Sequence, residues 1–300
     1  MKIERLTNEY TEEWTSLVYQ KYKELPWSQE MYKEQIMKFF EDEKCYHPYM
    51  VKEGAKILAI GALEIKNGKE GHIDHFVTSE RDDISLKTLL DFLLDESHKY
   101  QLNKVSIWIW DSEEKKIDLV GNAGFKPTIE MALMMYQLSD KVTEPISEEF
   151  IISSLKDSIA TKDFVTANRI AFKDDTSRPL EVEELNEWLQ EPSGFLPELQ
   201  LVALVNSRLV GTVMSEIFEA GELDDTSRQA WIYGLGVIPE WRRKGVGRSL
   251  VNELLTRMQG LGIKDVWILT DSEGGIREFY DKLKFVEKNR WRKFEYAIEG

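Results

Sequence analysis

A short basic loop with two glycines one residue apart is the segment of this sequence best suited to chemistry. Gly245 and Gly247 stand where a strand-like run over residues 231–238 ends and a helical pattern begins. Glycines there let the backbone approach an anion closely, and the free N–H groups of the helix start point toward it. The loop also carries four cations, Arg242, Arg243, Lys244 and Arg248. Val246 stands between the two glycines. The pattern predicts a pyrophosphate site.

Other phosphate-binding loops fit this segment less well. A nucleotide P-loop requires Gly-x-x-x-x-Gly-Lys followed by Ser or Thr, and the sequence contains no such run. A dinucleotide-binding turn requires a third glycine, but Leu250 stands at that position. A plain helix cap in a solvated basic turn is the remaining alternative. It is disfavoured because these cations stand out in a chain whose net charge is −15.

Two spaced motifs in the second half resemble those of a known family. Arg242-x-x-Gly245-x-Gly247 follows a strand end that contains Val237 and Pro239. This resembles the acetyl-CoA signature of the Gcn5-related N-acetyltransferases, the GNAT superfamily. Their second marker is a Tyr shortly before a Phe, which Tyr280 and the Phe of Lys284-Phe285 resemble. The resemblance covers residues 151–298 and is most specific over residues 231–285.

The resemblance implies a role for each matched position. Backbone groups of Leu235, Gly236 and Val237 would pair with the pantetheine arm of acetyl-CoA as an added strand. Backbone N–H groups of residues 243–248 would hold the pyrophosphate. Tyr280 would donate a proton to the departing thiolate, because a positioned hydroxyl stabilises developing negative charge.

Some positions depart from the family pattern. Glu273, Ile276 and Lys284 stand where family members often carry Asn, Ala and Gly. These departures affect the details of the cofactor contacts. Tyr280 also shares a helical face with apolar residues, so packing in the core is an alternative role for it.

An internal repeat predicts two domains of one kind. Residues 111–125 align with residues 271–285 at a spacing of 160, which joins Asp111 to Asp271 and Phe125 to Phe285, and each stretch follows a strand-like run, 105–110 or 266–270. Each segment reads as a buried strand, a short helix and a second strand. We therefore expect an α/β (α+β) fold of two tandem GNAT-like domains, residues 1–140 and 146–300, each a mixed, mostly antiparallel sheet flanked by helices. The polar residues 138–149 would link them.

The first domain is predicted to be a degenerate copy. The repeat aligns the two loop glycines with Ile84 and Leu86, and Tyr280 with Val120. The loop cations are replaced by acidic residues at 80, 82 and 83. Acid at that loop would repel a pyrophosphate, so we expect no coenzyme A there. A structural role is favoured, and a ligand of another kind is left open.

The acceptor and the general base are less marked in the sequence. Residues 174–225 contain thirteen acidic and two basic residues, and an acidic pocket mouth would attract a cationic amine. A solvated surface helix is the alternative interpretation of this stretch. Glu216, on the strand that precedes the run over residues 231–238, is the candidate base, with Asp271 or a water chain as alternatives.

Composition excludes some classes of function. A net charge of −15 disfavours binding to nucleic acid or an anionic membrane. Cys45 is the only cysteine, which excludes an intrachain disulfide and fits a reducing compartment. We expect a cytoplasmic protein without a signal peptide, a spanning helix or a metal site. The oligomeric state is not indicated.

These observations together predict an enzyme. We expect an acetyl-CoA-dependent N-acetyltransferase that acts on a small-molecule or peptide amine by direct attack, with its active site in the second domain. The rival from another class is a non-catalytic acyl-CoA-binding sensor or interaction protein. A sensor has no need of a proton donor at Tyr280, whereas a transferase does.

Overall fold

The computed structural model divides the chain into two compact units. Met1–Ala132 and Asn289–Gly300 form unit 1, and Leu133–Lys288 form unit 2. The structure describes residues 1–298 except 24, 26, 28, 43, 80–82, 139–148, 158, 174–178, 191–193 and 221–226. Most of the predicted linker and of the acidic loop at residues 80–83 lies outside the described residues. Among the described residues, none of the helices combines the length and apolar character needed to cross a bilayer.

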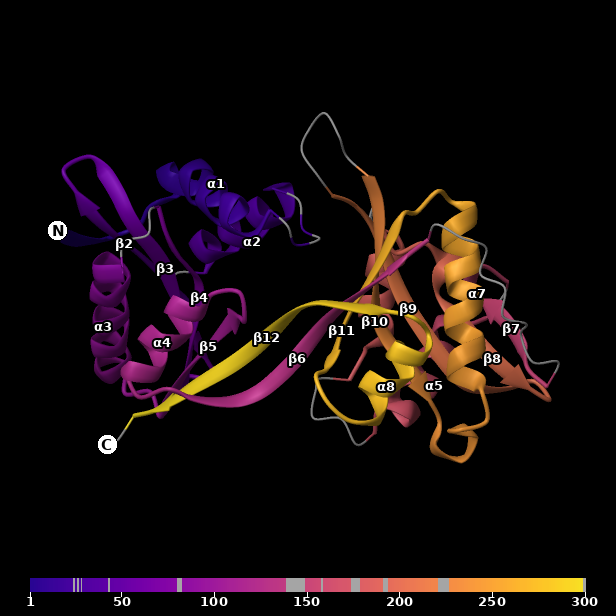
Figure 1. Cartoon of the computed structure of the whole chain (residues 1–300). Helices are drawn as coiled ribbons and strands as arrows, with labels where there is room; N and C mark the ends of the chain where they lie inside the picture. Colours follow the sequence, from indigo (N-terminus) through magenta and orange to yellow (C-terminus); the bar gives the residue numbers. More distant parts are fainter. Residues whose placement is uncertain are drawn as a thin grey trace. The chain divides into compact units, whose positions relative to one another are not determined.

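Unit 1 is a mixed sheet with helices on both faces (Figure 1). Its strands lie in the order β1-β2-β3-β4-β5-β12-β6, with β4 and β5 parallel. The elements are β1 Lys2–Arg5, η1 Asn8–Tyr10, α1 Thr11–Tyr22, α2 Gln29–Glu41, β2 Tyr46–Glu53, β3 Lys56–Lys66, β4 Glu70–Thr78, α3 Asp83–Lys99, β5 Lys104–Trp110, α4 Glu114–Asn122, and parts of β6 Lys126–Gln137 and β12 Val286–Ala297.

Two cores hold unit 1 together, one on each face of the sheet. On one face, α3 and α4 pack on the sheet through side chains such as Leu89 and Val120, both fully buried. On the other face, α1 and α2 cover it through Trp14 and Ile36, which are also fully buried. Strands buried on both faces read as nearly continuous apolar runs, as in Leu58–Leu63 of β3.

Unit 2 repeats this arrangement with strand order β6-β11-β10-β9-β8-β7. Its elements are part of β6, β7 Ile151–Ser154, η2 Leu155–Asp157, α5 Thr161–Ala171, α6 Val182–Gln190, η3 Pro197–Leu199, β8 Leu201–Val205, β9 Arg208–Ala220, β10 Ser227–Val237, η4 Pro239–Trp241, α7 Val246–Gly260, β11 Asp265–Asp271, α8 Gly275–Lys282 and the start of β12. Helices α5 and α6 form a core with β8 and β9. Helix α7 packs on β9, where Val246 and Leu250 lie against Gly211. The β10–β11 pair is parallel, as β4–β5 is in unit 1.

The fold confirms the predicted class, and it differs from the predicted domains at their ends. Residues 289–300 were expected in the second domain but belong to unit 1. There, Trp291–Ala297 pairs antiparallel with Trp110–Lys104 of β5, and Phe294 is 4% exposed in the core. Conversely, residues 133–137 of β6 belong to unit 2, where Tyr136 contacts Phe285. The last strand of each repeat thus contributes to the unit built from the other repeat.

Candidate active site

The first feature of the candidate site in unit 2 is a strand edge left open by a bulge. Strand β10 pairs with β9 on both sides of Tyr233, where the register shifts by one residue. Its parallel pairing with β11 ends at Ile232, opposite Ile268. From Tyr233 to Val237, β10 therefore has no β11 partner among the described pairs. We call residues 233–237 the open edge, because its backbone groups can pair with an extended ligand.

The open edge includes Leu235, Gly236 and Val237, the three residues predicted to meet pantetheine. Gly236 has a packing reason to be glycine. A Cβ there would lie 2.7 Å from both Ala171 Cβ and Phe172 Cε2, so the end of α5 packs directly against this backbone. The strand is thereby held close to α5 on one face while its edge remains free.

The glycine loop, residues 242–248, forms the second feature. Gly245 has a φ of 89° and is the N-cap residue of α7, a left-handed conformation that glycine adopts without strain. No side chain caps α7 and no acidic residue stands in its first turn. An anion at the helix start would therefore meet no carboxylate from that turn, and the helix dipole favours an anion there.

The loop cations divide into two kinds. The Arg242 guanidinium donates hydrogen bonds to the carbonyl of Val237 at 3.0 Å and to that of Ala171 at 2.9 Å. It therefore ties the loop to β10 and α5 while leaving a positive charge beside the loop. Lys244 lies over the ring of Trp241, 4.5 Å from its centroid, in a cation–π contact. The remaining two, Arg243 and Arg248, are exposed at the helix start.

Helix α8 places Tyr280 in a buried aromatic cluster. Tyr280 is 3% exposed and makes edge contacts with Phe279 at 5.0 Å and Phe285 at 5.4 Å. Burial raises the pKa of Tyr280, so the hydroxyl keeps its proton at neutral pH. No hydrogen bond to another described residue engages that hydroxyl. These properties suit a proton donor, and they also agree with the packing role that the sequence left as an alternative.

Helix α8 also packs at the glycine loop. A Cβ on Gly247 would lie 3.6 Å from Phe279 and from Val237, and 3.7 Å from Leu235. The start of α7, the open edge of β10 and the residue beside Tyr280 therefore meet at one place. The structure thus brings together the cradle residues that the sequence predicted in separate segments.

Glu216, the candidate base, has a partner that the sequence did not reveal. Tyr233, the bulged residue of β10, donates a hydrogen bond from its hydroxyl to Glu216 Oε2 at 2.6 Å. Burial raises the pKa of the Glu216 carboxyl above its usual value, although the Tyr233 hydroxyl acts against this. Burial and the nearby carboxylate raise the pKa of Tyr233. In the sequence, only the aromatic residues of β10 hint at such a partner. The contact between Tyr233 and Glu216 follows from the register of β9 and β10.

A pocket of about 410 Å³ opens beside the bulge. Its lining includes Tyr233 and Gly234 from β10 together with Met214, Trp188 and Phe172. The pocket mixes charges, because two cations, Arg169 and Lys173, line it along with the acidic Glu184. Along α6 the carboxylates of Glu183 and Glu187 are exposed while Leu185 is buried. Glu183 and Glu187 thus form a solvated helix face, whereas Glu184 of the same helix lines the pocket.

Comparison with known proteins identifies the family. The sequence model of the acetyltransferase (GNAT) family matches residues 163–285, which include the open edge, the glycine loop and Tyr280. Residues 163–285 of this chain belong to the GNAT superfamily. A curated GNAT relative, the uncharacterized N-acetyltransferase CgeE of Bacillus subtilis, is 33% identical over 72 residues. That match spans 23% of this chain and 28% of CgeE.

Solved GNAT structures resemble the whole chain. A GCN5-related N-acetyltransferase from Sphaerobacter thermophilus superposes with a TM-score of 0.73 at 16% identity, covering 100% of this chain and 96% of that one. A tandem GNAT protein from the clavulanic acid biosynthesis pathway, solved without AcCoA, superposes with a TM-score of 0.72 at 10% identity, covering 100% and 99%. At such identities the likeness concerns the fold. Both repeats thus have the GNAT fold.

Unit 1 keeps the GNAT scaffold without the markers of the cradle. Its parallel pair β4–β5 separates after Ile73 and Ile107, as β10–β11 does after the equivalent pair. The helix after it, α3, begins with Asp83, and Leu86 stands at the position of Gly247 with 6% exposure. Val120 stands at the position of Tyr280 and is fully buried. In the part of the chain that the structure describes, no group of three or more His, Cys, Asp or Glu side chains could hold a metal.

Proposed function

We propose that unit 2 transfers an acetyl group from acetyl-CoA to a primary amine. The observation that carries the proposal is the meeting of the open edge of β10 with the uncapped start of α7. One extended molecule could bind at both places, with a peptide-like arm along the open edge and a pyrophosphate at the start of α7. Leu235, Gly236 and Val237 would bind the pantetheine arm, and the glycine loop would hold the pyrophosphate.

The fit rests on three properties of this chain. No side chain caps the start of α7, and its first turn contains no acidic side chain that would repel an anion. Gly247 leaves the helix start without a side chain, and Arg242 ties the loop to its neighbours while adding positive charge. Arg243, Lys244 and Arg248 add further positive charge around the loop, and Val246 is buried beneath it.

The reaction would be a direct attack without a covalent enzyme intermediate. The amine nitrogen forms a bond to the thioester carbonyl carbon, and the C–S bond breaks. Glu216 would accept the proton that the amine loses, with the hydroxyl of Tyr233 relaying it from the neighbouring pocket. Tyr280 would donate its proton to the departing thiolate and recover one from solvent after release.

The acceptor is defined only as an amine by this proposal. The pocket beside Tyr233 is its suggested place, and the mixed charges of that pocket select no particular acceptor. The expected cytoplasmic location belongs to the proposal too, and the single cysteine and the acetyl-CoA donor support it.

The test has two steps on the full chain. Calorimetric unfolding is recorded with and without acetyl-CoA, which at about 100 times its dissociation constant stabilises its site by about 2.7 kcal/mol. Release of free coenzyme A thiol is then followed with a panel of amines. Stabilisation together with amine-dependent release that Tyr280→Phe reduces supports the enzyme. Stabilisation without release from any amine favours the acyl-CoA sensor, and the absence of both contradicts the proposal.

A further inference from the structure

Unit 1 holds a cavity at the place where its own parallel strands separate. The cavity has a volume of about 320 Å³ and opens where β4 and β5 diverge after Ile73 and Ile107. Seven of its lining residues are aromatic: Tyr22, Trp27, Tyr32, Phe76, Trp108, Trp110 and Trp291. We call it the aromatic cavity. It lies entirely within unit 1 and is separate from the site proposed for acetyl transfer.

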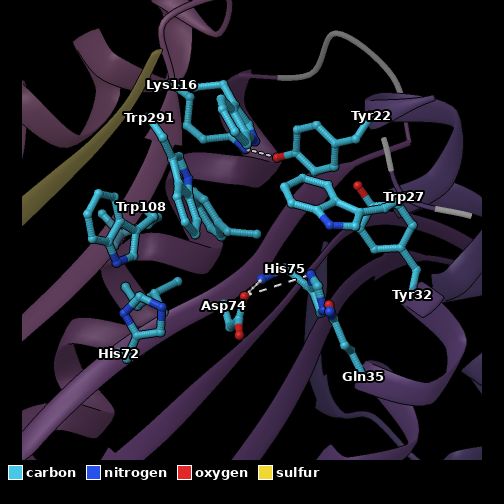
Figure 2. A pocket seen from close by; sticks show the side chains of 14 residues that line it. Tyr22, Trp27, Tyr32, Gln35, His72, Asp74, His75, Trp108, Lys116 and Trp291 are labelled. Carbon is cyan, nitrogen blue, oxygen red and sulfur yellow. Dashed lines mark hydrogen bonds and ion pairs between the residues drawn. The ribbon is translucent and has the colours of Figure 1, made fainter. Parts of the chain in front are cut away.

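The aromatic rings form two walls (Figure 2). Trp108 and Trp291 lie on one side, and Tyr22, Trp27 and Tyr32 lie on the other. The walls meet at Trp110, whose ring centroid lies 5.9 Å from that of Trp27 and 5.3 Å from that of Trp291. The rings within each wall are in contact: the centroids of Trp108 and Trp291 are 4.5 Å apart, and those of Trp27 and Tyr32 are 6.2 Å apart. Such walls can enclose the apolar body of a ligand and offer ring faces to a cation.

One cation in the cavity lining, Lys116, is already compensated by a buried carboxylate beside the cavity. Lys116 Nζ lies 2.7 Å from Glu113 Oε1, and their side chains are 8% and 4% exposed. The hydroxyl of Tyr22 accepts a hydrogen bond from Lys116 at 3.0 Å and donates one to Glu113. Lys21 Nζ lies 3.6 Å from Glu113 Oε1, so a second lysine also contributes positive charge beside this carboxylate. The ammonium of Lys116 is therefore not available to neutralise a second carboxylate.

Asp74 is the carboxylate that lines the cavity, and it lacks a matching cation among the described residues. Its side chain is 38% exposed, and Figure 2 shows it between the two aromatic walls. Its carboxylate accepts a hydrogen bond from the backbone N–H of His75 at 2.8 Å. Among the described residues, its only ion-pair contact is with the His75 ring, at 3.7 Å. Burial lowers the pKa of His75, so this ring is neutral near pH 7 and supplies no full charge.

Polar atoms in the cavity wall also lack partners. His75 Nε2 and the Tyr32 hydroxyl are buried without a hydrogen bond to the rest of the described chain. Tyr32 is only 5% exposed, so leaving its hydroxyl unpaired is unfavourable. His75 adopts a φ of 43° at the bulge of β4, a conformation uncommon for a residue with a side chain. Unpaired polar atoms and an unmatched carboxylate at one place are features of a binding site.

We propose that the aromatic cavity of unit 1 binds a small organic cation with an apolar body. The cationic group would lie against Asp74, and the body would lie between Trp27 and the wall of Trp108 and Trp291. The carboxylate supplies the charge and the rings supply cation–π contacts, which together discriminate a cation from a neutral molecule of equal shape. The proposal does not depend on acetyl transfer in unit 2.

The experiment uses the full chain and a matched pair of probes. Choline and its uncharged carbon isostere 3,3-dimethylbutan-1-ol are titrated separately, with tryptophan fluorescence and titration calorimetry as readouts. We expect saturable binding of choline that is at least about tenfold tighter than binding of the alcohol, a difference of about 1.4 kcal/mol. Because this comparison needs no variant, it does not depend on how a substitution affects folding.

Two variants then test the residue. Asp74→Asn keeps the shape of the side chain and removes its charge, and we expect it to weaken choline binding about tenfold while binding of the alcohol is unchanged. Asp91→Asn is the control, since Asp91 is an exposed carboxylate of α3 paired with Lys87, and it should leave choline binding unchanged. Equal binding of choline and the alcohol, or equal choline affinity in Asp74→Asn and the unmodified chain, would overturn the proposal. Absence of binding by choline and by the larger benzyltrimethylammonium up to about 10 mM would overturn it as well.

Discussion

Replacing Gly247 by Asp should move coenzyme affinity and protein stability in opposite directions. Gly247 is the second residue of α7, and a Cβ there would meet its nearest neighbours at ordinary contact distances of 3.6–3.7 Å. A side chain can therefore begin at this position without displacing the helix. The first turn of α7 contains no acidic residue, so an added carboxylate meets the positive end of the helix dipole.

The two effects can be estimated separately. A carboxylate about 5 Å from a phosphate charge, at an effective dielectric constant of about 40, costs about 1.7 kcal/mol, and the second phosphate charge raises this to about 2–3 kcal/mol. Affinity for acetyl-CoA should therefore fall about 30- to 150-fold. The same carboxylate stabilises the helix start by about 0.3–1 kcal/mol, and loss of glycine from a helix adds a few tenths of a kcal/mol.

Titration calorimetry and thermal unfolding of the unmodified chain, Gly247→Asp and Gly247→Asn together check this reasoning. Asn has nearly the same shape as Asp, so the difference between the two variants isolates the charge. That difference should shrink as salt increases. If Asp and Asn weaken binding equally at low salt, steric exclusion is the cause and the electrostatic argument is wrong. If neither weakens it, the helix start is not the pyrophosphate site.

Four further substitutions test other parts of the structure. Tyr280→Phe should lower kcat about a hundredfold with little change in the acetyl-CoA dissociation constant, and an equal loss of affinity would assign Tyr280 to packing instead. Glu216→Gln should remove the acid limb of the pH profile of kcat/KM. In the unmodified chain, activity should rise with pH through the raised pKa of Glu216 as the base loses its proton; a limb that persists in the variant would exclude Glu216. Lys284 has a φ of 65°, and Gly124 occupies the equivalent position of the first repeat. Lys284→Gly should therefore stabilise unit 2 by about 1 kcal/mol, and Gly124→Lys should destabilise unit 1 by a similar amount. Thermal melting measures both changes.

Local chemistry explains which parts of the site could be predicted from the sequence. The glycine loop depends on conformations that few residues other than glycine adopt, so Gly245 is visible in the sequence itself. The helix after it is set by the apolar spacing of residues close in the chain, such as Leu250 and Leu254. The internal repeat also allowed two strands to be predicted, at residues 105–110 and 266–270. The structure contains them as β5 and β11.

Pairings between distant strands could not be predicted in the same way. The apolar and aromatic pattern of residues 291–298 suits either sheet, and only the assembled unit shows that Trp291 packs on Trp108 and Trp110 of β5. The partnership of Glu216 and Tyr233 depends on a one-residue shift between β9 and β10, which no local pattern encodes. The aromatic cavity likewise requires Trp27, Asp74 and Trp291 to meet from three separate segments.

The strand exchanged at the end of the chain makes folding of unit 1 depend on synthesis of unit 2. A ribosome completes β1 to β5 early, but residues 291–297, which pair with β5, emerge only after every strand of unit 2. Until then the edge of β5 is an unpaired strand that Trp108 and Trp110 leave apolar and prone to association. Contacts so distant in sequence also close slowly. The nascent first repeat therefore stays incomplete while the ribosome adds the residues between β5 and β12.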